Sequence, residues 1–284
     1  MLILTLKKLP KNLTFHKPVL LQSACHFLAV KPGGLYIDAT LGGGSHAAEI
    51  IRLGGKVLGL DQDPEAISAC PDLDQLTKVH ANFIHLAEVA RQYHWSPVSG
   101  ILFDLGISSH QVDTASRGFS FQKSGLLDMR MDPGLPHTAA TLVNQLSVNQ
   151  LASLFKDFGE IPMAKPLAVK IVAARPLATT EQLAAVTGKW SRQAFQALRI
   201  AVNDELGAIQ TVLPQAHQLL ASAGRLVVIS FHSLEDRLVK HQFAAWQQAG
   251  QGRVITPDPV GPDLAEITAN SRSKSAKLRA YEKN

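Results

Sequence analysis

One stretch, residues 35–46, limits the folds open to this chain more than any other. It reads Leu-Tyr-Ile-Asp-Ala-Thr-Leu-Gly-Gly-Gly-Ser-His, an apolar run that ends in the carboxylate of Asp38 and passes through three glycines into a helix-compatible segment. This order predicts a strand, a tight turn and a helix. Glycine adopts positive φ without strain and has no Cβ, so a ligand can lie against such a turn. The N–H groups that open the next helix can then face that ligand.

A second carboxylate follows at a matching position, because the apolar run of residues 56–61 ends in Asp61. In a doubly wound sheet, this carboxylate lies where a ribose presents its hydroxyls, which predicts a nucleoside-containing cofactor. The spacing Gly42-x-Gly44-x-x-Ala47 also fits the dinucleotide pattern, so spacing alone leaves both NAD and S-adenosylmethionine (SAM) open. Asp38 favours SAM, because a carboxylate beside the turn suits a cationic amino group and repels a pyrophosphate.

Apolar runs separated by helical segments predict a parallel α/β sheet. Residues 98–104 give the clearest run, typical of a strand that is buried on both faces. The carboxyl ends of parallel strands meet at one edge, so the residues that end the four strands should surround one crevice. These residues are, in chain order, Asp38, Asp61, Phe83 and Asp104.

The alternation of strand-like and helical segments stops after the fourth strand. Residues 112–191 contain no strand-like run and are too long for a loop, which predicts an inserted helical subdomain. A long helix is expected over residues 195–222, with a break or kink at Pro214. The sheet should resume at residues 224–231, and Ser233 should cap the next helix. Residues 253–256 and 277–281 can pair as a closing antiparallel ribbon.

Composition narrows the class of protein. The 284 residues carry a formal charge of +5, with basic residues concentrated at both ends, which fits either a polyanionic partner or solvated termini. The two cysteines have no metal-ligand spacing, so we expect buried, reduced thiols and no metal. No run approaches a membrane span, and a cytoplasmic protein is expected. Residues 1–15 are expected to form a loose arm.

Several sequence blocks, in one order, point to one family. The chain resembles the RsmH (MraW) family of SAM-dependent methyltransferases over nearly its full length. The blocks that carry the resemblance are His16-x-Pro18-Val19-Leu20-Leu21, Asp38-Ala39-Thr40-x-Gly42-Gly43-Gly44-x-His46, Asp104-Leu105-Gly106-Ile107-Ser108-Ser109, Arg117-Gly118-Phe119-Ser120-Phe121, Leu127-Asp128-Met129-Arg130-Met131-Asp132, Phe195-Gln196-Ala197-Leu198-Arg199-Ile200 with Asn203 and Glu205-Leu206, Ser230-Phe231-His232-Ser233-Leu234-Glu235-Asp236-Arg237, and Arg272-x-x-Ser275-x-x-Leu278-Arg279.

The resemblance implies a Rossmann-like class I methyltransferase sheet with an inserted helical domain. The expected bounds are 1–112 and 192–284 for the SAM-binding domain and 113–191 for the substrate-recognition insert. It also implies methylation of the exocyclic N4 of one cytidine in the decoding region of bacterial 16S rRNA, with the small ribosomal subunit as partner; a homodimer stays open. The SAM contacts that it implies are Gly44, Ser45, His46, Asp61, Phe83, Asp104 and Gln111.

Asp104 is the candidate catalytic residue, because an acceptor for the amine N–H would localise the lone pair of a cytosine amino group; a backbone carbonyl of residues 105–108 is the alternative acceptor. Phe119 and Phe121 are candidates for stacking a displaced base, with subdomain core as the alternative. His232 is either a proton acceptor or a loop histidine held by its neighbours. Ser45 departs from the small residue usual in the family, and the two prolines of residues 159–166 should disrupt a helix.

Other functions stay open at this stage. A DNA or small-molecule methyltransferase would use the same fold. An RNA- and SAM-binding ribosome-assembly factor with little turnover is an alternative of another class.

Overall fold

The computed structural model describes residues 18–284, and the loose arm expected at residues 1–15 lies outside them. The chain divides into two compact units. Unit 1 contains the residues up to Gly106 and residues Ala208–Asn284, and unit 2 contains Ile107–Gly207. Both domain boundaries expected from the sequence, after residues 112 and 191, fall inside unit 2.

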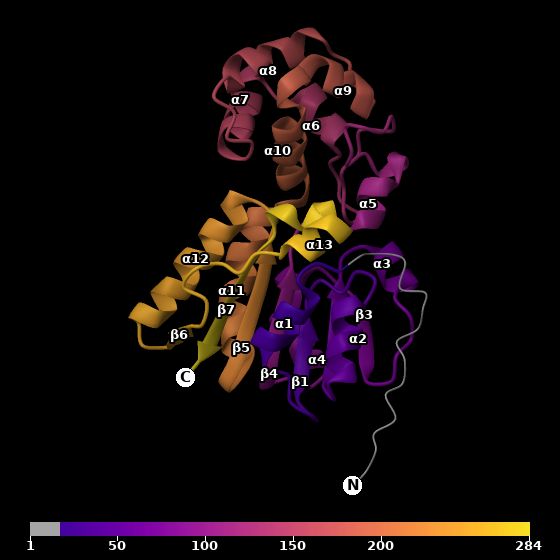
Figure 1. The fold of residues 1–284 in the computed structure, drawn as a ribbon. Coiled ribbons are helices and arrows are strands. Elements are labelled where there is room, and N and C mark those ends of the chain that lie inside the picture. Colours follow the sequence, from indigo (N-terminus) through magenta and orange to yellow (C-terminus); the bar gives the residue numbers. More distant parts are fainter. Residues whose placement is uncertain (1–17) are drawn as a thin grey trace. The chain divides into compact units, whose positions relative to one another are not determined.

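A seven-stranded sheet forms the centre of unit 1 (Figure 1). Its strands are β1 (Leu35–Asp38), β2 (Lys56–Asp61), β3 (Leu76–His80), β4 (Val98–Asp104), β5 (Leu220–Ser230), β6 (Gly252–Val254) and β7 (Lys277–Lys283). They lie in the order β3-β2-β1-β4-β5-β7-β6, and the first five are parallel. The predicted Rossmann-like α/β sheet is confirmed. The predicted closing ribbon is also present, because β7 pairs antiparallel with both β5 and β6.

The strand order reverses at β1, which pairs with β2 on one side and β4 on the other. The chain first builds outward from β1 to β3 and then returns to add β4 and β5 on the opposite side. Helices that connect strands on opposite sides of such a point diverge at the carboxyl ends of the strands, and this is where open α/β sheets bind ligands. The topology therefore places the candidate crevice beyond Asp38 and Asp104.

Helices cover both faces of this sheet. The helices of unit 1 are α1 (Leu21–Leu28), α2 (Ser45–Arg52), α3 (Pro64–Ala69), α4 (Leu86–Gln92), α11 (Glu205–Leu219, in this unit from Ala208), α12 (Ser233–Gln248) and α13 (Leu264–Ala269), with short 3-10 turns η1 (Phe83–His85) and η4 (Ser271–Ser275). α1 and α2 pack on one face, over a core that includes Tyr36, Val57 and Val227. On the other face α4 and α11 are joined by a hydrogen bond from the Ala87 amide to Gln215 Oε1 (2.9 Å).

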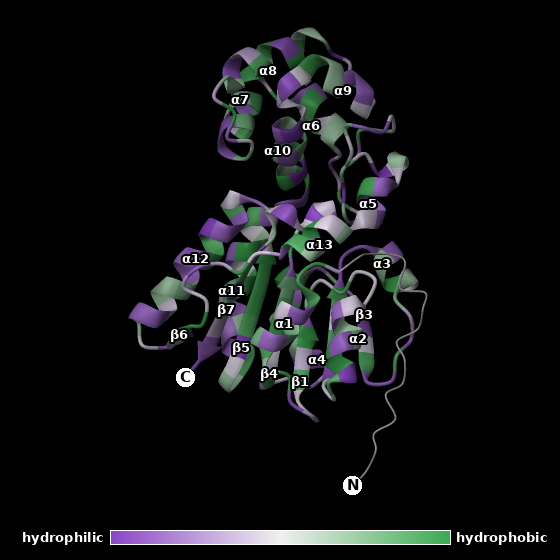
Figure 2. Cartoon of the chain, in the orientation of Figure 1, coloured by the Kyte–Doolittle hydropathy of each residue, from purple (hydrophilic) through white to green (hydrophobic). Residues whose placement is uncertain are grey.

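The middle strands are strongly hydrophobic, and Figure 2 draws β5 green over most of its length. Its residues Leu226 to Ser230 are all buried, as expected for a strand with helices on both faces. Among the residues that the structure describes, no helix is both long and apolar enough to cross a membrane.

Two boundaries differ from the predicted ones. β5 begins at Leu220 instead of residue 224, because an irregularity opposite Val98 and Gly100 lets four additional residues join the strand. The helix predicted over 195–222 is two helices, broken at Asp204 (φ 47°) and continuous through Pro214 in α11. Aspartate adopts the left-handed conformation more readily than most residues, and the apolar periodicity continues across it, so the pattern did not reveal the break.

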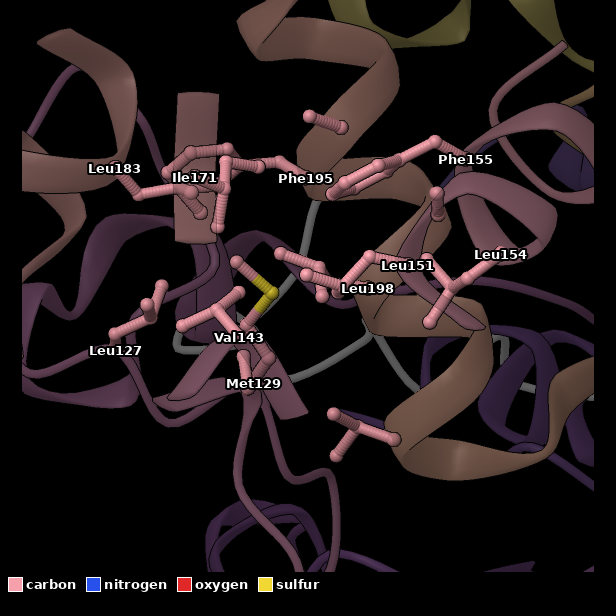
Figure 3. Close-up of a cluster of buried hydrophobic side chains, with 14 of the residues drawn as sticks. Leu127, Met129, Val143, Leu151, Leu154, Phe155, Ile171, Leu183, Phe195 and Leu198 are labelled. Atoms are coloured by element: carbon pink, nitrogen blue, oxygen red, sulfur yellow. The ribbon is translucent and has the colours of Figure 1, made fainter. Parts of the chain in front are cut away.

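Unit 2 is helical. Its elements are α5 (Ser109–Asp113), η2 (Ala115–Arg117), α6 (Ala139–Gln145), α7 (Val148–Asp157), α8 (Ala164–Ala173), α9 (Thr180–Thr187), η3 (Gly188–Trp190) and α10 (Ser191–Asn203). Side chains from α6 to α10 and from the segments between them form its core, and Phe155, Leu198 and Met129 are among its fully buried members (Figure 3). The prediction of a helix disrupted in residues 159–166 is wrong for Pro166, which lies in the first turn of α8, where a backbone N–H has no partner within the helix.

Candidate functional site

The glycine turn lies between the end of β1 and the start of α2. Gly42 (φ 50°) and Gly44 (φ 78°) both have positive φ, and Gly44 is the N-cap of α2. A Cβ on Gly44 would lie 2.5 Å from Cys70 Sγ, whereas a Cβ on Gly42 would meet nothing closer than 3.9 Å. Gly44 is thus required for both conformation and packing. Gly42 is required only for conformation, and the space beside it stays open.

Asp38 is buried at the end of β1, directly before this turn. Its Oδ1 accepts a long hydrogen bond from the Thr40 amide (3.3 Å), whereas its Oδ2 is buried without a hydrogen-bond partner among the described residues. Burial raises the pKa of Asp38 to about 7, and the nearby charge of Asp61 adds to the increase. A buried oxygen without a partner is costly, so the carboxylate favours a donor or a cation from outside the protein.

Asp61 connects the end of β2 to the turn. Its Oδ2 accepts the amide of Gly42 (2.8 Å), and its Oδ1 accepts the amide of Asp63 (2.9 Å). Burial raises the pKa of Asp61 to about 6, although these two amides favour the ionised form. A carboxylate oxygen can accept two hydrogen bonds and each of these accepts one of the two amides, so each retains acceptor capacity for a ribose hydroxyl.

Asp104 ends β4, the strand beside β1. Its amide donates to Thr40 Oγ1 (2.6 Å), and its Oδ1 is buried with no hydrogen-bond partner in the described chain. Its Oδ2 lies 3.8 Å from Nδ1 of His46, which is buried on α2. Burial, followed by the charges of Asp38 and Glu235, raises the pKa of Asp104 well above its usual value.

Phe83 does not end a strand as predicted. β3 ends at His80, and Phe83 opens the η1 turn, where the Asn82 side chain accepts the Ile84 amide. The strand prediction missed this because the polar Asn82 caps the turn instead of continuing the strand. The ring of Phe83 packs edge-on against Phe103 of β4, with the ring centres 5.6 Å apart. It therefore still lies against a strand of the site.

The sheet thus brings together the glycine turn, three strand-end carboxylates and His46 at one edge of unit 1. This geometry suits a nucleoside ligand that carries a positive charge. Two residues that position groups around this site, Thr40 and Glu266, were not singled out from the sequence. Thr40 holds the Asp104 amide, and Glu266 of α13 accepts the Leu20 amide (2.6 Å). Thr40 lies inside the Asp38-Ala39-Thr40 block, but no sequence signal links Leu20 to Glu266, 246 positions away.

Comparisons with known proteins agree with this geometry. Residues 13–284 match the model of the MraW methylase family. The chain belongs to that family. It is 47% identical to a ribosomal RNA small subunit methyltransferase H from Thermomicrobium roseum, over 95% of this chain and 94% of the relative. It is 44% identical to the enzyme of the same name from Symbiobacterium thermophilum, over 94% of this chain and 96% of the relative.

Two solved structures cover most of the chain at low identity. An rRNA methylase from Streptococcus thermophilus is 12% identical, with a TM-score of 0.47, and the match covers 94% of this chain and 97% of that one. A SAM-dependent O-methyltransferase from Thermotoga maritima is 9% identical, with a TM-score of 0.42, and the match covers 93% of this chain and 64% of that one.

Several blocks shared with the MraW methylase family contribute side chains that hold loops of unit 2 in place. Asn203 accepts the Met131 amide (2.8 Å) and donates to the Met129 carbonyl (2.8 Å), so one amide side chain holds two points of a loop. The guanidinium of Arg117 donates to the Met131 carbonyl (2.9 Å). An ion pair between Arg130 Nε and Asp128 Oδ1 (2.8 Å) stabilises the same loop.

The remaining candidate residues have separate positions. Gln111 belongs to unit 2, where its side chain completes the capping box of α5 by accepting the Ser108 amide (3.0 Å). Ser45 is the first residue of α2, directly after the turn. Phe119 is buried in the core of unit 2, whereas Phe121 is exposed and packs edge-on against Phe195.

His232 is a helix cap. It is the N-cap of α12, where its Nδ1 faces the Glu235 amide (3.4 Å) and Glu235 accepts the Phe231 amide (2.8 Å). This is the second of the two alternatives for His232, a loop histidine held by its neighbours. It also corrects the predicted cap, because Ser233 is the first residue of the helix. The predicted buried thiols are confirmed for Cys25 and Cys70.

Proposed function

We propose that this chain transfers a methyl group from SAM to the exocyclic N4 of a cytidine in the decoding region of bacterial 16S rRNA. Family membership and the names of relatives at 40–47% identity support an rRNA methyltransferase. The observation that carries the cofactor assignment is the buried Oδ2 of Asp38, which has no partner in the described chain and lies beside an open glycine turn. The N4 position and the decoding-region site rest on the family resemblance.

The residues present fit SAM. Asp38 offers a carboxylate to a cationic amino group, and Asp61 offers acceptor capacity to two ribose hydroxyls. Gly42 leaves room for close approach to the backbone, and Phe83 offers an apolar ring face at the same edge of the sheet. When bound, SAM supplies a methyl group attached to a positively charged sulfur. After the transfer, the rest of the cofactor leaves as a neutral thioether.

Asp104 is proposed to act on the methyl acceptor. The lone pair of a cytosine amino group is delocalised into the ring, and a hydrogen bond from the amine N–H to Asp104 localises it on nitrogen. The ionised carboxylate is the stronger acceptor for this bond. The remaining contribution is to hold the amine close to the methyl carbon and in line with it, which converts binding into rate.

Unit 2 is proposed to recognise the RNA, and the family resemblance implies that Gln111, near its start, contacts SAM. Phe121 is the better stacking candidate of the pair, because its ring is exposed whereas Phe119 is part of the core. The small ribosomal subunit is the proposed partner.

A methylation assay tests this function. The protein is incubated with labelled SAM and one of three acceptors: naked 16S rRNA, small subunits from a strain that lacks this activity, or DNA. The acceptor is then digested to nucleosides for mass spectrometry. N4-methylcytidine from rRNA or from small subunits is the expected product, absent with Asp104→Asn. Label on DNA alone, or another methylated nucleoside, contradicts the proposal. SAM binding without turnover on any acceptor identifies a binding factor instead.

A further inference from the structure

The imidazole of His46 lies close to the carboxyl group of Asp104, and cofactor binding does not explain why these two side chains are adjacent. The two side chains come from different elements, α2 and the end of β4, and they are only 6% and 10% exposed. His46 Nδ1 lies 3.8 Å from Asp104 Oδ2. At this distance a small movement of either side chain brings the two atoms within hydrogen-bond range.

The other nitrogen of His46 determines the orientation of the pair. Nε2 lies 3.2 Å from the carbonyl oxygen of Val19. A carbonyl oxygen only accepts hydrogen bonds, so Nε2 carries the proton in neutral imidazole. Nδ1 then carries no proton, and it lies 3.8 Å from Oδ2 of Asp104. This is the arrangement in which a histidine can take a proton from a neighbouring acid.

Asp104 lies among negative charges. Asp38 of β1, Glu235 of α12 and Glu266 of α13 all raise its pKa, in addition to burial. Among the described residues His46 is the basic side chain that the structure records in contact with Asp104, and its imidazolium form would offset part of this negative potential. Without such a neighbour, a carboxyl group in this position holds its proton strongly and is a poor hydrogen-bond acceptor at neutral pH.

We propose that His46 is a positioning residue that shares one proton with Asp104 and thereby sets the pH range in which Asp104 can receive a proton from the methyl acceptor. This proposal rests on the proposed function and deepens it. In the step, the amine lone pair forms the N–C bond while the C–S bond breaks and its electron pair stays on sulfur. The amine then loses one proton to the pair, where it lies between Asp104 Oδ2 and His46 Nδ1, and solvent later removes it.

Two substitutions separate this role from a structural one. The amide of glutamine in His46→Gln reaches the position of Nε2, so it preserves the contact with Val19 and removes the atom that faces Asp104. The amide of asparagine in His46→Asn lies near the position of Nδ1, so it can still donate a hydrogen bond to Asp104 but cannot take up a proton. His217→Gln on α11 is the matched control, because it removes a histidine that packs against Trp246 and Tyr281.

The first experiment requires no methyl acceptor. Nitrogen NMR of the histidine side chains is recorded across pH in the folded protein, with His46 assigned by its loss in His46→Gln. We expect neutral His46 to carry its proton on Nε2, and Asp104→Asn to lower its titration midpoint by removing a negative charge. A proton on Nδ1 in the neutral form, or an unchanged midpoint in Asp104→Asn, overturns the proposal.

The second experiment is the pH dependence of kcat with saturating SAM. His46→Gln should lower kcat by about 100-fold and move the acidic limb to higher pH, because general acid–base contributions are of this size. His46→Asn should keep part of the rate but also lose the wild-type limb, whereas His217→Gln should retain the wild-type profile. A lower kcat with an unchanged profile indicates a structural role and overturns the proposal. If wild type methylates no acceptor, the proposed function fails, and the NMR result still decides whether the proton is shared.

Discussion

SAM binding should release protons, because the site holds carboxyl groups that burial keeps partly protonated. Asp38 has a pKa of about 7 and Asp61 of about 6. A cationic ligand favours their ionised forms, so its binding is linked to proton release. The ionised fraction of Asp38 falls from about one half at pH 7 to about one tenth at pH 6. The affinity for SAM should therefore fall about fivefold between pH 7 and pH 6, and about tenfold for each further unit.

Isothermal titration calorimetry measures both quantities. At pH 7 the heat should depend on the ionisation enthalpy of the buffer, with about half a proton released by Asp38 for each SAM bound. Adenosine is the matched ligand control, because it shares the nucleoside but lacks the amino group. Between pH 6 and pH 8 the affinity for adenosine should change less than about threefold, compared with about tenfold for SAM. An equal change for both ligands, or no buffer dependence for SAM, refutes the assigned role of Asp38.

The substitution Asp38→Asn tests the same linkage in the unliganded protein. Burial raises the pKa of Asp38 from its ordinary value of 3.8 to about 7, so the folded chain binds more protons than the unfolded chain between about pH 4 and pH 7. The free energy of unfolding should fall as the pH rises through this range. Asp38→Asn should therefore raise stability by about 1–3 kcal/mol at pH 8, with a smaller gain at pH 5, and should weaken SAM binding. Loss of stability at pH 8 would contradict this.

Three further substitutions test packing and charge in unit 1. Gly44→Ala should destabilise the protein by about 2–4 kcal/mol in urea unfolding, because it adds left-handed strain and overlap with Cys70, whereas Gly42→Ala should cost only about 1–2 kcal/mol from strain. An equal loss of unfolding free energy in both variants would show that the overlap with Cys70 adds no destabilisation. Asp236→Asn should cost about 3–5 kcal/mol in the same assay, because it leaves Arg279, buried and 2.5 Å from Asp236 Oδ1, without its counter-charge. A cost below about 1 kcal/mol would mean that the pair contributes little.

The chain's blocks shared with the family and the local pattern around the first glycine turn predicted the fold class. The strand, turn and helix of residues 35–52 form because apolar alternation, glycine conformations and helix propensity act over a few neighbouring residues. The start of α3 depends on equally local features, because Asp63 caps this helix by accepting the Glu65 amide (3.0 Å) and Pro64 lies in its first turn. Such features depend on short-range sterics and hydrogen bonds, which the sequence expresses directly.

The sequence alone determined that three carboxylates end neighbouring parallel strands, and therefore that a polar crevice exists. Only the tertiary structure decided what each carboxylate contacts. His46 meets Asp104, and Glu266 holds Leu20, across separations that no periodicity encodes. The break at Asp204 and the early start of β5 were also decided by the packing of distant segments. Burial sets the proton affinity of Asp38 and Asp104, and burial is a property of the assembled fold.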